Sequence, residues 1–143
     1  MRITLPWPPS VNHIYQHTRN GVLLDPKVKI YRVQIGAIIA RLRANGSIPR
    51  EPMTERLAIR MLVYEPDNRR RDLDNLWKCA LDALTKVNLW SDDSLIDHAG
   101  NHRMKAKSGC ITLIIEPATQ LLDEDVERLG ANPLPLHANP NPS

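Results

Sequence analysis

Residues 57–93 decide the fold, and they run LAIRMLVYEPDNRRRDLDNLWKCALDALTKVNLWSDD. The first part, residues 57–64, is apolar and partly β-branched, which predicts a strand in the middle of a sheet. The polar residues 65–68 end this strand. Over residues 73–87 apolar side chains recur at three- and four-residue spacing, which predicts an amphipathic helix. Its apolar stripe consists of Leu73, Leu76, Trp77, Ala80, Leu81 and Leu84.

The chain before this unit is predicted to add one strand and one helix. Residues 3–5 are apolar and form a strand that opens the sheet. Residues 6–12 hold three prolines and form a rigid, extended loop that carries an exposed or half-buried Trp7. Residues 13–24 are predicted to be irregular, with a turn at the glycine. A helix follows over residues 27–44, and its apolar face consists of Val28, Tyr31, Ile35, Ile38, Ile39 and Leu42.

The chain after residue 93 is predicted to add two strands. One falls within residues 95–104 and the other is residues 110–116. Residues 105–109 between them are typical of a hairpin connection. The resulting order, β-α-β-α-β-β, predicts an α+β fold: a single two-layer domain with a mixed β-sheet and two main helices.

Length and composition are consistent with one domain. The chain has 143 residues, of which 42% are hydrophobic, so it can bury a real core but not two ordinary ones. We place the domain at residues 1–117. Residues 118–143 are first acidic and then rich in Pro and Asn, which predicts a short helix as far as Arg128 and then a disordered tail.

Several classes of protein are disfavoured. No apolar run approaches the roughly 20 residues that span a bilayer. The N-terminus lacks the apolar segment of a signal peptide, so the cytoplasm is the expected location. Cys79 and Cys110 form no CxxC pair, and two reduced thiols are the simplest interpretation.

The charge is distributed unevenly along the chain. Residues 1–115 hold 18 of the 19 Lys and Arg but 11 of the 16 Asp and Glu, a net charge of +7, and the remainder carries −4. A basic body suggests a polyanionic partner. Ordinary surface charge that keeps a protein soluble explains the same numbers equally well.

Asp72 and Asp74 stand where the predicted helix begins. An acidic residue at this point often caps a helix by accepting backbone N–H groups, and for a single Asp that interpretation would suffice. Two close carboxylates repel each other, however, and a bound divalent cation removes the conflict. Asp92 and Asp93 follow the helix. If the next strand runs back beside the strand ending at residue 64, this pair returns to the same end of the sheet, and the oxygen-rich set suits Mg²⁺ or Mn²⁺.

Basic residues accompany these carboxylates. Lys78 lies four residues after Asp74, on the same polar helix face. From spacing alone a surface ion pair is the better explanation, although the lysine could also contact a phosphate. Asp82 continues this face and is better explained as half of a surface pair. Arg69, Arg70 and Arg71 precede the carboxylates directly, which favours a phosphodiester that the arginines hold while a metal activates water.

Two other interpretations of these residues are weaker. The DxD nucleophile of aspartyl-phosphate phosphatases usually follows an apolar strand directly, whereas three arginines intervene here. His98 and His102 have the spacing of a helical zinc pair, but Gly100 and the strand-like context disfavour a zinc site.

The block of residues 68–93, NRRRDLDNLWKCALDALTKVNLWSDD, closely resembles the RusA family of Holliday junction resolvases, found in bacteria and their prophages. The opening LPWPPSVNHIYQH, residues 5–17, resembles the N-terminus of the same family. The resemblance covers residues 3–116 and is most specific in the central block. Members of the family are small homodimers that bind four-way DNA junctions and nick two opposed strands with Mg²⁺ or Mn²⁺. The resemblance therefore implies a homodimeric, metal-dependent endonuclease acting in DNA recombination and repair.

The resemblance also implies roles for single residues. The family's metal-binding, catalytic carboxylates fall on Asp72, Asp74 and Asp93, with Asp92 as a neighbour of the site. The family's important lysine falls on Lys78, which reverses the preference from spacing. The residues implied to bind DNA are Asn12, His13, Tyr15, Arg69, Arg70, Arg71 and Lys78. Asn68 stands where the family can have a longer run of arginines.

Two alternatives to junction resolution remain open. The same carboxylates would serve a less selective nuclease that cuts flaps or other branches. A non-catalytic protein that binds branched DNA is a third hypothesis, and a missing carboxylate would have indicated it.

Overall fold

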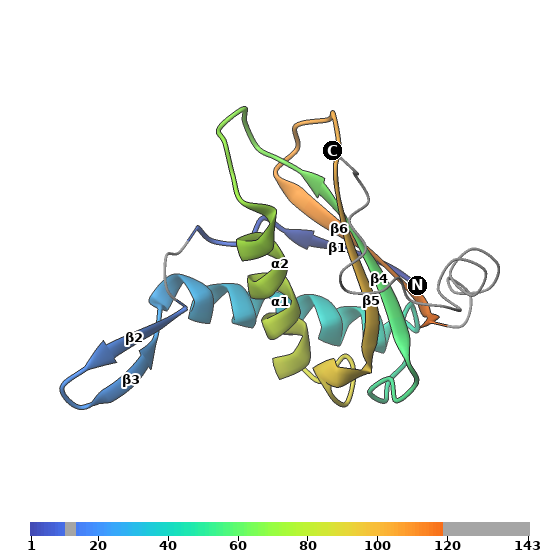
Figure 1. Cartoon of the computed structure of the whole chain (residues 1–143). Helices are drawn as coiled ribbons and strands as arrows, with labels where there is room; N and C mark the ends of the chain where they lie inside the picture. The colour runs from blue at the N-terminus through green and yellow to red at the C-terminus, as the bar shows by residue number, and fades with distance from the viewer. Residues whose placement is uncertain (11–13, 119–143) are drawn as a thin grey trace, which may run out of the picture.

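A mixed sheet of four strands forms the centre of the molecule (Figure 1). The computed structural model describes residues 1–10 and 14–118. The sheet has the order β1-β6-β4-β5, in which β6 is antiparallel to both of its neighbours. The strands are β1 Arg2–Pro6, β4 Leu57–Tyr64, β5 Ile96–Arg103 and β6 Cys110–Pro117. With two helices, α1 Pro26–Ala44 and α2 Leu73–Lys86, they make the predicted α+β domain.

The core lies between one face of the sheet and the two helices. The strand residues on this face are at most 2% exposed, and they are Ile3, Leu5, Leu57, Ile59, Met61, Val63, Ile111, Leu113 and Ile115. They pack in one cluster with helix residues that include Tyr31, Ile35, Ile39, Ala80 and Leu84. The alternation of buried residues along the strands thus gives the predicted two layers, and the apolar stripes of both helices are confirmed as core-facing.

Local capping fixes where each helix begins. Asp25 Oδ1 accepts the backbone N–H of Lys27 at 2.8 Å, and Pro26 follows in the first helical position, so α1 begins one residue before the predicted start. α2 begins at the predicted residue. After α2 ends, Asn88 has a φ of 54°, a left-handed conformation that Asn tolerates better than most residues.

The prediction of an irregular segment at residues 13–24 is wrong for its described part. Tyr15–Thr18 (β2) and Gly21–Leu24 (β3) pair as an antiparallel hairpin that projects beyond the start of α1 (Figure 1). The predicted turn at Gly21 is confirmed, with a φ of 128°. All but one of the hairpin residues are exposed, so these strands lack the apolar alternation by which a half-buried strand is recognised.

The prediction of a hairpin between the last two strands is also wrong. β5 pairs in parallel with β4, and β6 lies on the other side of β4. The segment after β5 therefore crosses the C-terminal end of β4, where Gly109 lies against Pro66 with a φ of 68°. The unit β4-α2-β5 is a parallel crossover, which needs an intervening helix rather than a tight turn.

Part of the sequence-based description lies outside the described residues. This applies to all but the first residue of the short helix and disordered tail predicted after Pro117, and to Asn12 and His13. Within the described residues, no helix has the combined length and apolar character needed to cross a bilayer.

Candidate active site

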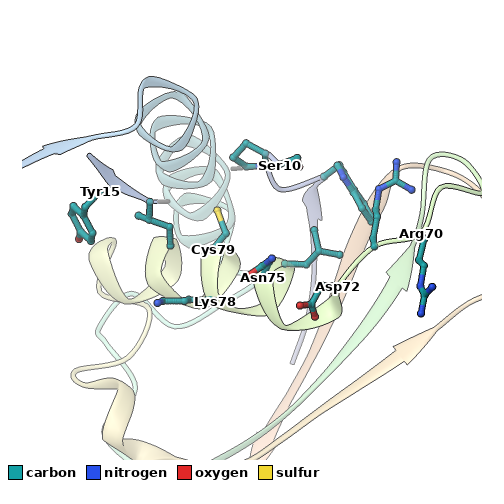
Figure 2. A pocket seen from close by; sticks show the side chains of 12 residues that line it. Ser10, Tyr15, Arg70, Asp72, Asn75, Lys78 and Cys79 are labelled. Atoms are coloured by element: carbon teal, nitrogen blue, oxygen red, sulfur yellow. The ribbon is translucent and has the colours of Figure 1, made fainter. Parts of the chain in front are cut away.

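A cleft of about 450 Å³ opens where the loop after β1, the arginine run and the first turns of α2 meet (Figure 2). Apolar groups of Trp7, Pro9 and Ile14 line one part of it. Its polar lining includes Ser10, Tyr15, Arg70, Arg71, Asp72, Asn75 and Lys78. The structure therefore brings together predicted site residues from two separate stretches of the chain, Tyr15 from the N-terminal part and residues 70–78 from the central block.

Asp72 caps α2 and also faces this cleft. Its Oδ1 accepts the backbone N–H of Asp74 at 3.0 Å, and the residue has the extended backbone of a helix N-cap. The capping bond uses Oδ1, so the second oxygen, Oδ2, is left out of it. The two interpretations of Asp72, as a cap and as a ligand, are therefore compatible.

The first turns of α2 present polar groups on the same side as Asp72. Residues at spacings of three and four share one helix face, and Asn75 and Lys78 are both exposed and line the cleft. Asn75 was missed in the sequence, although its spacing of three from Asp72 is the signal that could have found it. Asp74 lies exposed in the first turn of α2.

Arg71 is fixed more firmly than the other arginines of the run. Its Nη1 lies 2.7 Å from Asp67 Oδ1, and its guanidinium lies 5.4 Å from the centre of the Trp7 ring. Its side chain is 19% exposed, compared with 84% for Arg69. The hydrogen bond from Arg71, together with one from the Arg69 backbone N–H, lowers the pKa of Asp67 from 3.8 to about 2. Arg71 thus shapes the loop as well as lining the cleft.

Asp93 lies far from Asp72 in the chain's own fold. Asp93 begins a 3₁₀ turn (η1, Asp93–Leu95) directly before β5, and Ile96 pairs with Leu57 at the start of β4. Asp72 instead follows the end of β4, and the 14 residues of α2 lie between the two, a length of about 21 Å. The expectation that Asp92 and Asp93 return to the end at which β4 finishes is wrong, because it required an antiparallel strand.

The predicted metal ligands accordingly do not meet within one chain. Across residues 1–10 and 14–118, no three Asp, Glu, His or Cys side chains gather closely enough to hold a metal ion. Asp92 has a capping role of its own: its Oδ1 accepts the backbone N–H of Ser94 at 2.7 Å. Hydrogen bonds from the Ser94 side chain and backbone lower the pKa of Asp92. The role of Asp93 as a ligand stays a prediction.

Of the N-terminal residues predicted to bind DNA, Asn12, His13 and Tyr15, the structure describes Tyr15. It begins β2, is 47% exposed and lines the cleft beside α2. A phenol at this place can contact a phosphate or stack on a base.

A cleft in which aspartate and lysine side chains adjoin a run of arginines is typical of proteins that act on phosphodiesters. The fold and the cleft are thus those of a small α+β protein with a site suited to a phosphodiester. The family model described as "Endodeoxyribonuclease RusA" matches residues 6–116. The chain therefore belongs to the RusA endodeoxyribonuclease family, as its sequence resemblance predicts.

Individual relatives agree with this assignment. The chain is 39% identical over 114 residues to the crossover junction endodeoxyribonuclease of Enterobacteria phage 82, an alignment that covers 79% of this chain and 91% of the relative. It is 40% identical over 116 residues to the crossover junction endodeoxyribonuclease of Escherichia coli K12, with the same coverage of 79% and 91%. Its identity to the protein of that name from Shigella sonnei is also 40%.

Proposed function

We propose that this protein is a structure-selective endodeoxyribonuclease that resolves Holliday junctions by paired nicking, in DNA recombination and repair in the cytoplasm. The observation that carries the proposal is the cleft shared by Asp72, Lys78, Arg70 and Arg71. Family membership and relatives named crossover junction endodeoxyribonucleases support it.

The carboxylates fit a hard divalent cation. Asp72 and Asp74 are both exposed at the start of α2, and carboxylate oxygens are the ligands that Mg²⁺ and Mn²⁺ prefer. We infer that Asp72, Asp74 and Asp93 hold Mg²⁺, or Mn²⁺. When bound, the ion supplies Lewis-acid chemistry that activates water and offsets charge on the phosphate.

The remaining side chains of the cleft bind and orient the DNA. Lys78 lines the cleft from the second turn of α2, and its ammonium group can donate to a phosphate oxygen as negative charge develops on that oxygen. Arg70 can hold the backbone beside the reacting phosphate through charge-assisted hydrogen bonds. Both side chains project from ordered backbone. Lys78 lies on α2, and Arg70 lies in the loop that the contacts of Arg71 anchor.

We further propose that the active protein is a homodimer in which each site takes Asp93 from the other subunit. Within one chain Asp93 lies about one length of α2 from Asp72, so a two-fold axis between antiparallel α2 helices would place the partner's Asp93 beside Asp72 and Asp74. Exposed apolar side chains on the hairpin and α1 favour an association surface, and they are Val22, Leu23, Ile30 and Val33.

Cleavage of a synthetic four-way junction tests the activity. With Mg²⁺ we expect symmetric nicks in two opposed strands, no cleavage of linear duplex, and loss of cleavage in Asp72→Asn. Intact junctions under both Mg²⁺ and Mn²⁺, with gel shifts in EDTA, would favour a non-catalytic binding protein. Equal cleavage of flaps and junctions would favour a less selective nuclease.

Mixed dimers test the shared site. Asp72→Asn and Asp93→Asn subunits, each inactive alone, are unfolded together and refolded. If each site combines two subunits, a mixed dimer holds one doubly altered site and one intact site, so single-strand nicking returns. If each chain builds its own site, both sites stay defective and the mixture remains inactive.

A further inference from the structure

A second pocket lies on the other side of the arginine run from the cleft. Its volume is about 520 Å³, and its lining is Glu65, Asn68, Arg69, Arg70, Arg71 and Arg103. Arg70 and Arg71 line both hollows, so the run forms the wall between them. Arg103, at the end of β5, belongs to this basic pocket and lies 32 positions from Arg71 in the sequence.

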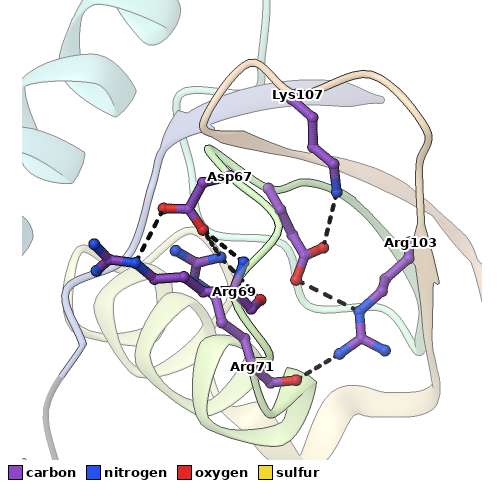
Figure 3. Close-up of polar contacts among 6 residues, drawn as sticks. Asp67, Arg69, Arg71, Arg103 and Lys107 are labelled. Atoms are coloured by element: carbon purple, nitrogen blue, oxygen red, sulfur yellow. Dashed lines mark hydrogen bonds and ion pairs between the residues drawn. The ribbon is translucent and has the colours of Figure 1, made fainter.

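A buried carboxylate organises the pocket (Figure 3). The Glu65 side chain is 8% exposed, directly after the end of β4. Its Oε1 lies 3.5 Å from Arg103 Nε, and its Oε2 accepts a hydrogen bond from Lys107 Nζ at 3.3 Å. Arg103 also donates from Nη2 to the carbonyl oxygen of Arg71. Glu65 therefore ties the end of β5 to the segment before β6, and Arg103 links both to the arginine run.

The cations keep binding capacity after these contacts. Arg103 is 50% exposed and Lys107 is 38% exposed, so Glu65 anchors them without covering them. A guanidinium has five N–H donors, and the contacts of Arg103 with Glu65 and Arg71 occupy two of its nitrogens. Five cations, Arg69, Arg70, Arg71, Arg103 and Lys107, stand against two carboxylates, Glu65 and Asp67, so the pocket is basic overall.

We propose that this pocket binds a backbone phosphate of the same DNA that enters the cleft, with Arg103 as a contact residue and Glu65 as a positioning residue. Because Arg70 and Arg71 line both hollows, a strand lying across the run would place one phosphate at Lys78 and another, further along the strand, at Arg103. A phosphodiester fits four convergent arginines better than a neutral ligand does. This inference rests on the proposed function, since it assigns further contacts to the same DNA.

Salt-dependent binding tests the role of Arg103. Affinity for a junction and for linear duplex is measured by fluorescence anisotropy in EDTA from 50 to 200 mM salt, with the full-length chain. Arg103→Gln is expected to weaken both affinities on the order of tenfold, the loss of one charge-assisted hydrogen bond, and to flatten the slope of log K against log salt by about 0.9. Arg103→Lys keeps the charge and should retain most of the slope.

Arg2→Gln is the matched control. Arg2 is exposed on β1, and its neighbour Ile3 faces the core, so its side chain lies on the sheet face away from the helices. The substitution removes the same charge and should leave affinity and slope near those of the unaltered chain. Equal effects of Arg2→Gln and Arg103→Gln would overturn the proposal, because they would show only a general effect of net charge.

The variant Glu65→Gln tests whether Glu65 positions Arg103 or only reduces the local positive charge. If Glu65 only lowered the local positive charge, its neutralisation would strengthen DNA binding. We expect weaker binding instead, and a smaller further loss when Arg103→Gln is added than Arg103→Gln causes alone. Stronger binding overturns the positioning role. If Glu65→Gln fails to fold, scanning single neutral methylphosphonates along the junction strand decides the contact: one position should weaken binding of the unaltered chain but not of Arg103→Gln.

The outcomes separate this inference from the proposed function. A chain that binds junctions with the predicted Arg103 dependence but never cuts them would refute the nuclease and leave the pocket intact. A chain that cuts junctions while Arg103→Gln behaves as Arg2→Gln would refute the pocket alone.

Discussion

Substitutions at Asp72 can separate its role as a helix cap from its predicted role as a metal ligand. Asp72 Oδ1 accepts the Asp74 N–H at 3.0 Å, and an Asn side chain offers an equivalent oxygen, whereas Ala offers none. Replacing a capping Asp by Ala costs about 1 kcal/mol, and Asn caps about as well as Asp. Loss of the negative charge at an exposed helix N-terminus adds about 0.5 kcal/mol to either variant.

The energies of the capping bond and of the charge predict different losses of stability for Asp72→Ala and Asp72→Asn. The free energy of unfolding should fall by about 1.5 kcal/mol in Asp72→Ala but by about 0.5 kcal/mol in Asp72→Asn. Cleavage should fall equally in both, by roughly a thousandfold, since several kcal/mol of transition-state stabilisation disappear. Urea denaturation in EDTA at one protein concentration measures stability, and junction cleavage in Mg²⁺ measures activity.

Stability and cleavage test the two roles of Asp72 independently. Equal loss of stability in the two variants would show that the capping bond contributes nothing. Undiminished cleavage by Asp72→Asn would show that the charge of Asp72 is not needed, and the proposed metal site would have to be abandoned.

Three further predictions concern the core, the loop and the thiols. Leu84→Ala, at a fully buried position of α2, should lower the free energy of unfolding by about 2–5 kcal/mol in urea denaturation, because a cavity forms between helix and sheet. The pKa of Asp67 in the folded protein is lowered to about 2, so its pairing with Arg71 stabilises the protein above pH 3.8, and this stabilisation is lost as the pH falls towards 2. The difference in melting temperature between the unaltered chain and Asp67→Asn should therefore be constant near neutral pH and disappear between pH 3.8 and 2. A difference that does not change with pH would contradict this assignment. Burial raises the pKa of Cys79 to about 11, so iodoacetamide at pH 8 should label Cys110 and spare Cys79, as mass spectrometry can check.

The parts of the fold that the sequence predicted best are those whose patterns are strong and local. β4 has the predicted bounds, and α2 begins where predicted and ends one residue earlier. An apolar run beside an acidic cap at Asp72 leaves few alternatives, because burial and capping act within a few residues of each other.

The parts that were missed depend on contacts between distant segments. The β2–β3 hairpin is short and exposed, so no apolar pattern specifies it. The side of β4 on which β5 lies is decided by the packing of α2 across the sheet, which no spacing within residues 95–116 reveals.

The same difference between local and long-range contacts decides which residues of the candidate site could be predicted from the sequence. Asp72, Lys78 and Arg70 are close in sequence, and the structure places them in one cleft. The position of Asp93 depended on strand direction and was predicted at the wrong end of the sheet. Arg103 was missed because only the fold brings β5 beside the arginine run.

The separation of Asp93 from Asp72 has a consequence for when the protein can cut DNA. If each site needs groups from two subunits, a lone subunit carries no complete site and is harmless to DNA on its own. Activity then rises with the square of concentration while dimers are scarce, and dilution switches it off. Newly made chains would therefore stay inert until enough of them have accumulated to pair.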